Sequence, residues 1–175
     1  MSHTLHDYLD FATAAADQAG KLTLGYFQTG VRPDFKEDET PVTVADRQAE
    51  TLIRERIKDH FPEHAIIGEE FGEVHSEGAS HRWFIDPIDG TKAFVRGVPL
   101  YAVLIGLEIE GTIEVGVANF PAMGEMIAAA SGLGCWWNGR PARVSKTKRL
   151  ENALVAHADA ASFDKYGRGE AWNRL

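Results

Sequence analysis

The residues best suited to do chemistry lie in one short stretch, Asp86-Pro87-Ile88-Asp89-Gly90-Thr91. Two carboxylates stand three residues apart after the apolar run 83–85, and a Gly-Thr turn follows them. Paired acids at a strand end can bind hard cations, and a Gly-Thr turn that opens a helix can bind a phosphate. The alternative is a tight acidic turn that is capped by its own side chains.

A second acidic pair decides between these interpretations. The segment 64–70 is predicted to be a short apolar strand that ends in Glu69 and Glu70. If this strand lies beside the one that ends at Asp86, then Glu69, Asp86 and Asp89 converge at one edge of the sheet. Three converging carboxylates favour a metal site over a self-capped turn.

Magnesium is the metal that this donor set predicts. Asp86, Asp89, Glu69 and the backbone carbonyl of Ile88 offer only oxygen ligands, whereas the sequence has one cysteine and no histidine spacing typical of zinc. Magnesium retains water molecules that can act as nucleophiles. The Thr91 hydroxyl could orient such a water, and a nearby carboxylate could accept its proton.

Two further residues are candidates for the same site. Asp46 could accept the proton from a water held by Thr91, although alone it reads as a first-turn acid favoured by the helix dipole. Lys36 lies in the polar segment 31–42, which is expected to be a loop or hairpin. This lysine is either solvated or placed beside the carboxylates.

The elements that must position these residues indicate an α+β fold. Helices are predicted at 4–27, with Thr4 as N-cap, and at 43–60, where Thr43 and Asp46 resemble a capping box. An antiparallel meander is predicted after them, together with a surface loop at 71–81 and a short helix at 91–97. The further strands are expected at 100–108, 112–120, 125–130, 132–139 and 153–158, and a last helix is expected to start near residue 160.

Composition limits the possible partners. The formal charge is −8, and the one basic cluster, residues 140–149, reads as a solvated loop, so nucleic-acid binding is not expected. The longest apolar run, 100–107, is too short to span a membrane, and the N-terminal residues do not resemble a signal peptide. The single cysteine, Cys135, excludes an intrachain disulfide and is consistent with a cytoplasmic location.

The combined motifs resemble the inositol-monophosphatase-like family of magnesium-dependent, lithium-sensitive phosphatases. Gly68-Glu69-Glu70 and Asp86-Pro87-Ile88-Asp89-Gly90-Thr91 match its metal motifs, and 40–46 matches its helix-entry motif. The resemblance implies a layered α-β-α-β-α fold in which two N-terminal helices pack on a largely antiparallel sheet. It also implies hydrolysis of a small phosphate ester by direct attack of a metal-activated water, two or three Mg²⁺ ions, inhibition by lithium, and a homodimer.

The resemblance also implies residue roles. Asp46, Thr91 and Glu69 form the implied catalytic set, while Asp89, Gly90 and Thr91 lie at the substrate phosphate. The implied metal ligands are Glu69, Asp86, the carbonyl of Ile88 and Asp89. Lys36 and Glu70 are two weaker site residues.

One family feature does not occur in this sequence. The family places another metal-binding aspartate in a Trp-Asp-x-Ala-Ala-Gly motif, and no such motif is present in these 175 residues. The chain is therefore expected to be an N-terminal portion, with a metal-binding domain at 1–150 and the start of a second domain at 151–175. Alone, it is expected to bind the second metal weakly and to be inactive.

Within the family, two segments are similar to bacterial histidinol-phosphate phosphatases: 69–72 and 91–100. This similarity favours a role in histidine biosynthesis, with inositol-1-monophosphatase or a related sugar or nucleotide phosphatase as the alternative. A non-catalytic module that binds metal or phosphate is an alternative of another class. A purely structural subunit is disfavoured because it would leave the converging carboxylates without a use.

Overall fold

The computed structural model describes residues 3–74, 78–157 and 161–174. The chain divides into two compact units, Met1–Ala142 and Arg143–Leu175. The division falls eight residues before the predicted domain boundary at 150, and the assignment of 151–175 to a second domain stays a prediction. Each unit is described separately below.

Two long helices begin the first unit, as predicted. Helix α1 (Leu5–Tyr26) starts at Thr4, whose side chain forms a capping box with Asp7. Helix α2 (Val44–His60) starts at Thr43, and the predicted capping box with Asp46 is present. These reciprocal bonds satisfy backbone groups that each helix end would leave without partners, which explains why both helices begin where they do.

Among the described residues, eight strands form one sheet in the order β10-β9-β8-β7-β6-β5-β3-β4. Strands β3 and β5 run parallel, and every other neighbouring pair is antiparallel, so the predicted α+β class is confirmed. The strands are β3 (Ala65–Gly68), β4 (Gly72–Val74), β5 (His81–Asp89), β6 (Ala102–Ile109), β7 (Thr112–Phe120), β8 (Glu125–Ala130), β9 (Gly134–Trp137) and β10 (Arg140–Pro141).

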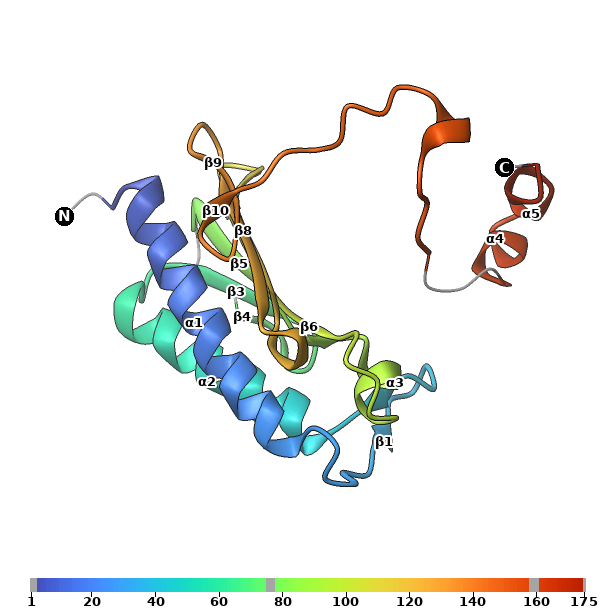
Figure 1. The fold of residues 1–175 in the computed structure, drawn as a ribbon. Coiled ribbons are helices and arrows are strands. Elements are labelled where there is room, and N and C mark those ends of the chain that lie inside the picture. The colour runs from blue at the N-terminus through green and yellow to red at the C-terminus, as the bar shows by residue number, and fades with distance from the viewer. Residues whose placement is uncertain (1–2, 75–77, 158–160, 175) are drawn as a thin grey trace. The chain divides into compact units, whose positions relative to one another are not determined.

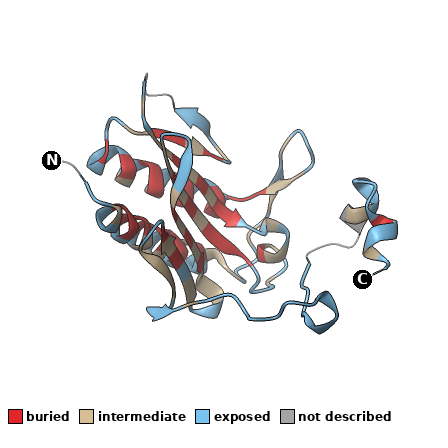
Figure 2. Ribbon diagram, turned by 90° about the horizontal axis from the view of Figure 1, so that it is seen from above, coloured by how far each residue is buried: buried red, intermediate tan, exposed pale blue. Residues whose placement is uncertain are grey.

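Both helices pack on the same face of this sheet (Figure 1). Figure 2 shows the buried residues gathered between the helices and the strands. Alternate residues of β6, namely Val103, Ile105 and Leu107, are buried in this core, as the two-residue period of a strand requires. Helix α1 contributes mainly alanines, which allow its backbone to approach closely: Ala12, Ala15, Ala16 and Ala19 are fully buried.

The short connections mostly follow the sequence predictions. The segment 31–42 is a hairpin whose strands are β1 (Asp34–Phe35) and β2 (Pro41–Val42). The hairpin between β6 and β7 turns at Glu110 and Gly111, both with positive φ, as a tight two-residue turn requires. The predicted helix at 91–97 is shorter, with α3 at Thr91–Phe94, and a 3₁₀ turn (η1, Pro121–Met123) precedes β8.

The prediction of a loop over 71–81 was wrong in part. Strand β4 lies there and pairs antiparallel with β3 through Ile66–Val74 and Gly68–Gly72. Gly72, with φ of 66°, allows the chain to reverse directly after the two glutamates. The polar composition of the segment concealed an edge strand whose residues are all exposed.

One prediction in the second unit was also wrong. Residues 153–157 of the predicted strand 153–158 form no strand, and residue 158 lies outside the described residues. A strand needs a hydrogen-bonded neighbour, and the described part of this unit contains none. The helix expected to start near residue 160 is present as α4 (Ala161–Lys165), and a second short helix, α5 (Gly169–Trp172), follows it. Between them, Gly167 has φ of 66°, and the amides of Gly167 and Arg168 bond back to Asp164 and Phe163. A 3₁₀ turn (η2, Leu150–Asn152) precedes these helices.

No helix in the described ranges is both long enough and apolar enough to cross a membrane.

Candidate active site

An irregularity in β5 places Asp86 and Asp89 on the same face of the sheet. In a regular strand, residues three apart point to opposite faces. Here Asp86 pairs with Leu104 and Asp89 pairs with Ala102, so two residues of β5 oppose a single residue of β6. This is a β-bulge, and Pro87, which cannot donate a ladder hydrogen bond, lies within it. The bulge therefore turns a sequence spacing of three into a pair of neighbouring carboxylates.

The parallel pairing of β3 with β5 brings a third carboxylate to this point. Gly68 is in register with Ile85, and the amide of Glu69 donates to the Ile85 carbonyl at 3.1 Å. Burial, the charge of Glu69 and a hydrogen bond with it raise the pKa of Asp86 to about 8, and the charge of Asp89 adds to the effect. Asp86 thus contacts Glu69 and lies within electrostatic reach of Asp89, which is the part of the predicted convergence that the structure shows.

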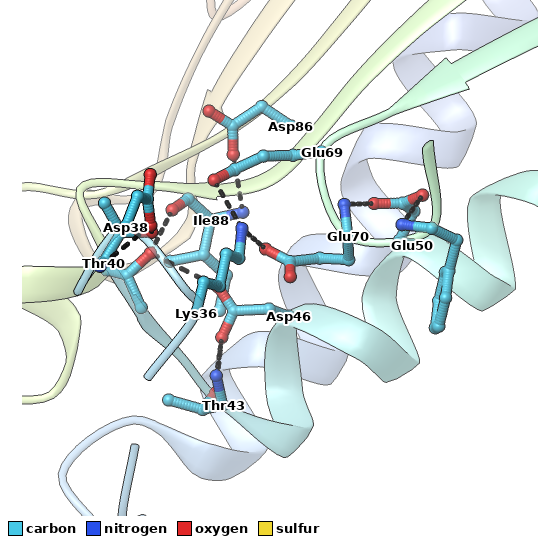
Figure 3. Close-up of polar contacts among 12 residues, drawn as sticks. Lys36, Asp38, Thr40, Thr43, Asp46, Glu50, Glu69, Glu70, Asp86 and Ile88 are labelled. Atoms are coloured by element: carbon cyan, nitrogen blue, oxygen red, sulfur yellow. Dashed lines mark hydrogen bonds and ion pairs between the residues drawn. The ribbon is translucent and has the colours of Figure 1, made fainter. Parts of the chain in front are cut away.

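Thr91 and Asp46 also meet, although they are 45 residues apart. The Thr91 hydroxyl lies 3.3 Å from Asp46 Oδ1 and 3.0 Å from the Ile88 carbonyl oxygen, and it donates to these acceptors. The second Asp46 oxygen accepts from the amide and hydroxyl of Thr43 at 2.7 and 2.6 Å (Figure 3). Burial raises the pKa of Asp46, and the hydrogen bonds from Thr43 and Thr91 offset part of that rise. Asp46 is therefore both a helix cap and the acceptor behind Thr91.

Gly90 occupies a position that only glycine fits. Its φ is 91°, and a Cβ at this position would lie 2.9 Å from the backbone oxygen of Leu100. The amides of Ala93 and Phe94 both bond to the Gly90 carbonyl, so the sharp turn leads directly into α3. The tight turn expected from the Gly-Thr pair is present.

Lys36 lies beside the carboxylates and is not simply solvated. Its amine is 2.9 Å from Glu69 Oε1 and 2.9 Å from Glu70 Oε1 (Figure 3). Burial alone would lower the pKa of Lys36, but the hydrogen bonds and charges of the two glutamates outweigh it and raise that pKa. Burial raises the pKa of Glu70, and the hydrogen bond and charge of Lys36 offset part of that rise. The hairpin of β1 and β2 thus supplies a cation to this acidic cluster.

The donor set fits a hard divalent cation in its chemistry. Glu69, Asp86, Asp89 and the Ile88 carbonyl provide only oxygens, and a cation would offset both the burial of Asp86 and the neighbouring charges that raise its pKa. Within the described ranges, however, no three acidic, histidine or cysteine side chains are already gathered as a metal site. Lys36 holds the Glu69 carboxylate instead. The Glu69 carboxylate is thus shared between the Lys36 amine and Asp86.

Sequence reasoning missed the ion pair behind this cluster. Glu50 is fully buried on α2, and its Oε1 accepts from Arg54 Nε at 2.6 Å. The same carboxylate accepts from the amides of Glu70 and Phe71 at 2.7 and 3.3 Å. A signal was present, because Glu50 and Arg54 are four residues apart on the predicted helix 43–60 and can therefore pair across one turn.

Comparison with known proteins identifies the family. The sequence profile of the inositol monophosphatase family matches residues 4–166. The chain belongs to the inositol monophosphatase family. It is 52% identical over 138 residues to a histidinol-phosphatase of Chlorobaculum parvum, an alignment that covers 78% of this chain and 53% of the relative. A histidinol-phosphatase of Mycobacterium tuberculosis is 39% identical over 171 residues, covering 94% of this chain and 65% of the relative.

Solved structures support the same family fold. The extragenic suppressor protein SuhB of Bartonella henselae aligns with a TM-score of 0.78 at 33% identity, over 82% of this chain and 56% of that protein. The chain thus spans between 53% and 65% of the length of these relatives. The sequence-based recognition of the family is confirmed, while the roles of individual site residues stay predictions.

Proposed function

We propose that the protein carrying this chain is a Mg²⁺-dependent phosphomonoesterase that hydrolyses histidinol phosphate. The observation that carries the reaction class is the Thr91–Asp46 hydrogen bond, which lies in the same turn as Asp86 and Asp89, together with the contact between Asp86 and Glu69. The similarity to two histidinol-phosphatases supports the substrate. The observed acids supply oxygen donors, and Thr91 supplies a hydroxyl that is already held by a buried carboxylate.

Each residue has a distinct role in this proposal. Glu69, Asp86, Asp89 and the Ile88 carbonyl would hold Mg²⁺, which supplies charge neutralisation and a water of lowered pKa when bound. The Thr91 hydroxyl, held between Asp46 and the Ile88 carbonyl, orients the attacking water through its free lone pairs. Asp46 takes up the proton passed through Thr91, since its burial makes the protonated form easier to reach.

The phosphate of the substrate would lie against the turn at Gly90 and Thr91, next to Asp89. The missing Cβ of Gly90 keeps this turn close to the Leu100 backbone, which fixes where the Thr91 hydroxyl points. Lys36 would retain Glu70 when Glu69 turns to the metal, because the amine contacts both carboxylates equally in this structure. We extend the proposal to a cytoplasmic homodimer that lithium inhibits.

The test is phosphate release by the full-length protein from histidinol phosphate, with and without Mg²⁺. Asp89→Asn keeps the size of the side chain but removes the ligand charge, and we expect activity to fall by about 10²-fold or more. Asp17→Asn, an exposed acid of α1 that pairs with Lys21, is the matched control and should retain activity. Near-normal activity of Asp89→Asn would show that the metal assignment is wrong.

A substrate panel tests the second part of the proposal. Inositol-1-phosphate is the main competitor, because an inositol monophosphatase of tomato is 36% identical over 165 residues. A higher kcat/KM for inositol-1-phosphate than for histidinol phosphate would retain the reaction class and refute the substrate. Metal binding without phosphate release from any phosphate ester would favour a non-catalytic module instead.

A further inference from the structure

The buried carboxylate of Glu50 is bonded to the turn that carries Glu69 and Glu70. Glu50 Oε2 accepts the Glu70 amide at 2.7 Å, and Oε1 accepts the Phe71 amide at 3.3 Å. Figure 3 shows the Glu50 side chain reaching from α2 toward the Glu70 backbone. A buried acceptor with these amide donors leaves the turn little freedom to move relative to the helix.

Arg54 fixes Glu50 from the other side. Its Nε donates to Glu50 Oε1 at 2.6 Å, and its guanidinium also donates to the carbonyl of Gly72, which begins β4. Both side chains are nearly inaccessible, with relative exposures of 7% for Arg54 and 0% for Glu50. The pair therefore binds both backbone donors and a backbone acceptor of the β3–β4 turn.

The sequence around the turn is adapted to this contact. A Cβ at Gly68 would lie 1.9 Å from Glu50 Oε1 and 2.7 Å from an Arg54 nitrogen, so a side chain there would displace the pair. On the opposite side of the turn, the Glu69 amide is bonded to Ile85 of β5, one residue before Asp86. The Glu69 backbone is thus held between β5 and the Glu50–Arg54 pair.

Helix α2 connects this turn to the other half of the site. Glu50 follows Asp46 by four residues, which places both on the same side of the helix. Asp46 receives the Thr91 hydroxyl, and Glu50 receives the Glu70 amide. One helix therefore sets the distance between the β3–β4 turn and the Asp86–Thr91 turn.

We propose that Glu50, held by Arg54, is a positioning residue that keeps Glu69 and Glu70 where Mg²⁺ and the Lys36 amine require them. The proposal rests on the proposed function, because Mg²⁺ is the group that these glutamates would serve. Residues behind the ligands commonly change metal affinity by about 10–100-fold when they are replaced. Glu50 contacts the backbone of the turn, so it acts through the position of the turn.

The test uses the full-length protein and the double variant Glu50→Leu/Arg54→Leu. Removing both partners avoids leaving an unpaired buried charge, and such apolar replacements commonly preserve folding. Mg²⁺ binding is followed by calorimetry, Mg²⁺-dependent phosphate release is followed in parallel, and amide exchange is measured by NMR. The matched control is Ile57→Ala, which removes a fully buried apolar side chain of the same helix that offers the turn no hydrogen bond.

In the double variant we expect Mg²⁺ affinity to fall by about 10–100-fold. We expect the Glu70 and Phe71 amides to exchange about tenfold faster, because each loses its acceptor. The Glu69 amide should keep its rate, since its acceptor is Ile85. Ile57→Ala should lower the melting temperature and leave the Mg²⁺ affinity unchanged, and Glu50→Gln, which keeps one acceptor oxygen, should lie between wild type and the double variant.

Wild-type Mg²⁺ affinity in a folded double variant would overturn the proposal, as would an equal loss of affinity in Ile57→Ala. If the double variant does not fold, wild-type affinity and amide exchange in Glu50→Gln would overturn it. If the wild type binds Mg²⁺ but releases no phosphate, and the double variant still binds Mg²⁺ more weakly, the proposed function fails and the positioning role stands. If the unaltered protein binds no Mg²⁺, both are refuted.

Discussion

Replacing Gly90 with alanine should destabilise the protein far more than the same change in an ordinary turn. An L-residue with a left-handed backbone costs about 1–2 kcal/mol relative to glycine. At Gly90 the new Cβ would also lie 2.9 Å from the Leu100 backbone oxygen. Because this neighbour is a backbone atom, no side-chain rotation can relieve the contact. Forcing such atoms apart costs about 1–3 kcal/mol more. The expected total is about 2–5 kcal/mol.

Gly111 provides the matched control for this calculation. Its φ of 84° is close to the 91° of Gly90, but nothing lies within 4 Å of the position that a Cβ would occupy there. Gly111→Ala should therefore show the backbone cost alone, and the difference between the two variants measures the contact with Leu100. That difference should be about 2 kcal/mol, or about 4–8 °C in melting temperature.

The assay is urea unfolding followed by tryptophan fluorescence, since Trp83 is fully buried in the core. Phosphate release should also fall in Gly90→Ala and remain in Gly111→Ala. Gly90 directly precedes Thr91, whereas Gly111 lies in the hairpin between β6 and β7. Equal unfolding free energies for the two variants would refute the argument that the approach of Leu100 requires glycine.

Two further results are expected. Burial and the charges of His81 and His3 lower the pKa of His64 from 6.5 to about 4. The neutral ring therefore contributes fully to the free energy of unfolding above pH 6.5, and this contribution is lost as the pH falls toward 4. Solvent screening of the half-buried ring reduces this loss to about 1.5 kcal/mol. The urea midpoint should therefore change less between pH 7 and pH 4.5 in His64→Gln than in the wild type. Equal changes in the two proteins would contradict the assignment. In α1, Gly20→Ala should destabilise by about 1–3 kcal/mol because its Cβ would lie 2.3 Å from Asn119 Nδ2, whereas Gly25→Ala, with nothing within 4 Å, should stabilise by up to about 1 kcal/mol. Thermal melts of both variants check this pair, and destabilisation by Gly25→Ala would contradict it.

Local chemistry explains why the helices and hairpins could be predicted from the sequence. Thr43 and Asp46 form their capping box from residues three apart, so the start of α2 needs no information from elsewhere. The turn at Glu110 and Gly111 likewise depends on two adjacent residues. The segment 153–157 shows the limit of such patterns, because an apolar run becomes a strand only beside a hydrogen-bonded neighbour.

Several of the predicted site residues do lie together in the structure, but their geometry could not be predicted from the sequence. A spacing of three between Asp86 and Asp89 would separate them in a regular strand, and only the pairing with β6 reveals the bulge that brings them together. Lys36 is 33 residues from Glu69, so no local pattern could choose between a solvated and a bridging lysine. The spacing of Glu50 and Arg54 allows an ion pair, but the role of Glu50 as acceptor for the Glu70 amide appears only when the chain after β3 folds against α2.

The positions of these residues imply that the site has two adjustable parts rather than one. Asp86 and Asp89 depend on the register between β5 and β6, which is set by the pairing of the two strands at the bulge. Asp46 and Glu50 both depend on α2, so any shift of that helix moves the acceptor of Thr91 and the support of the Glu69–Glu70 turn together. A change that displaces α2 should therefore impair proton transfer and metal binding in parallel. A change in the bulge should alter metal binding and leave the Thr43–Asp46 cap intact, since that cap lies within α2 and its N-cap residue.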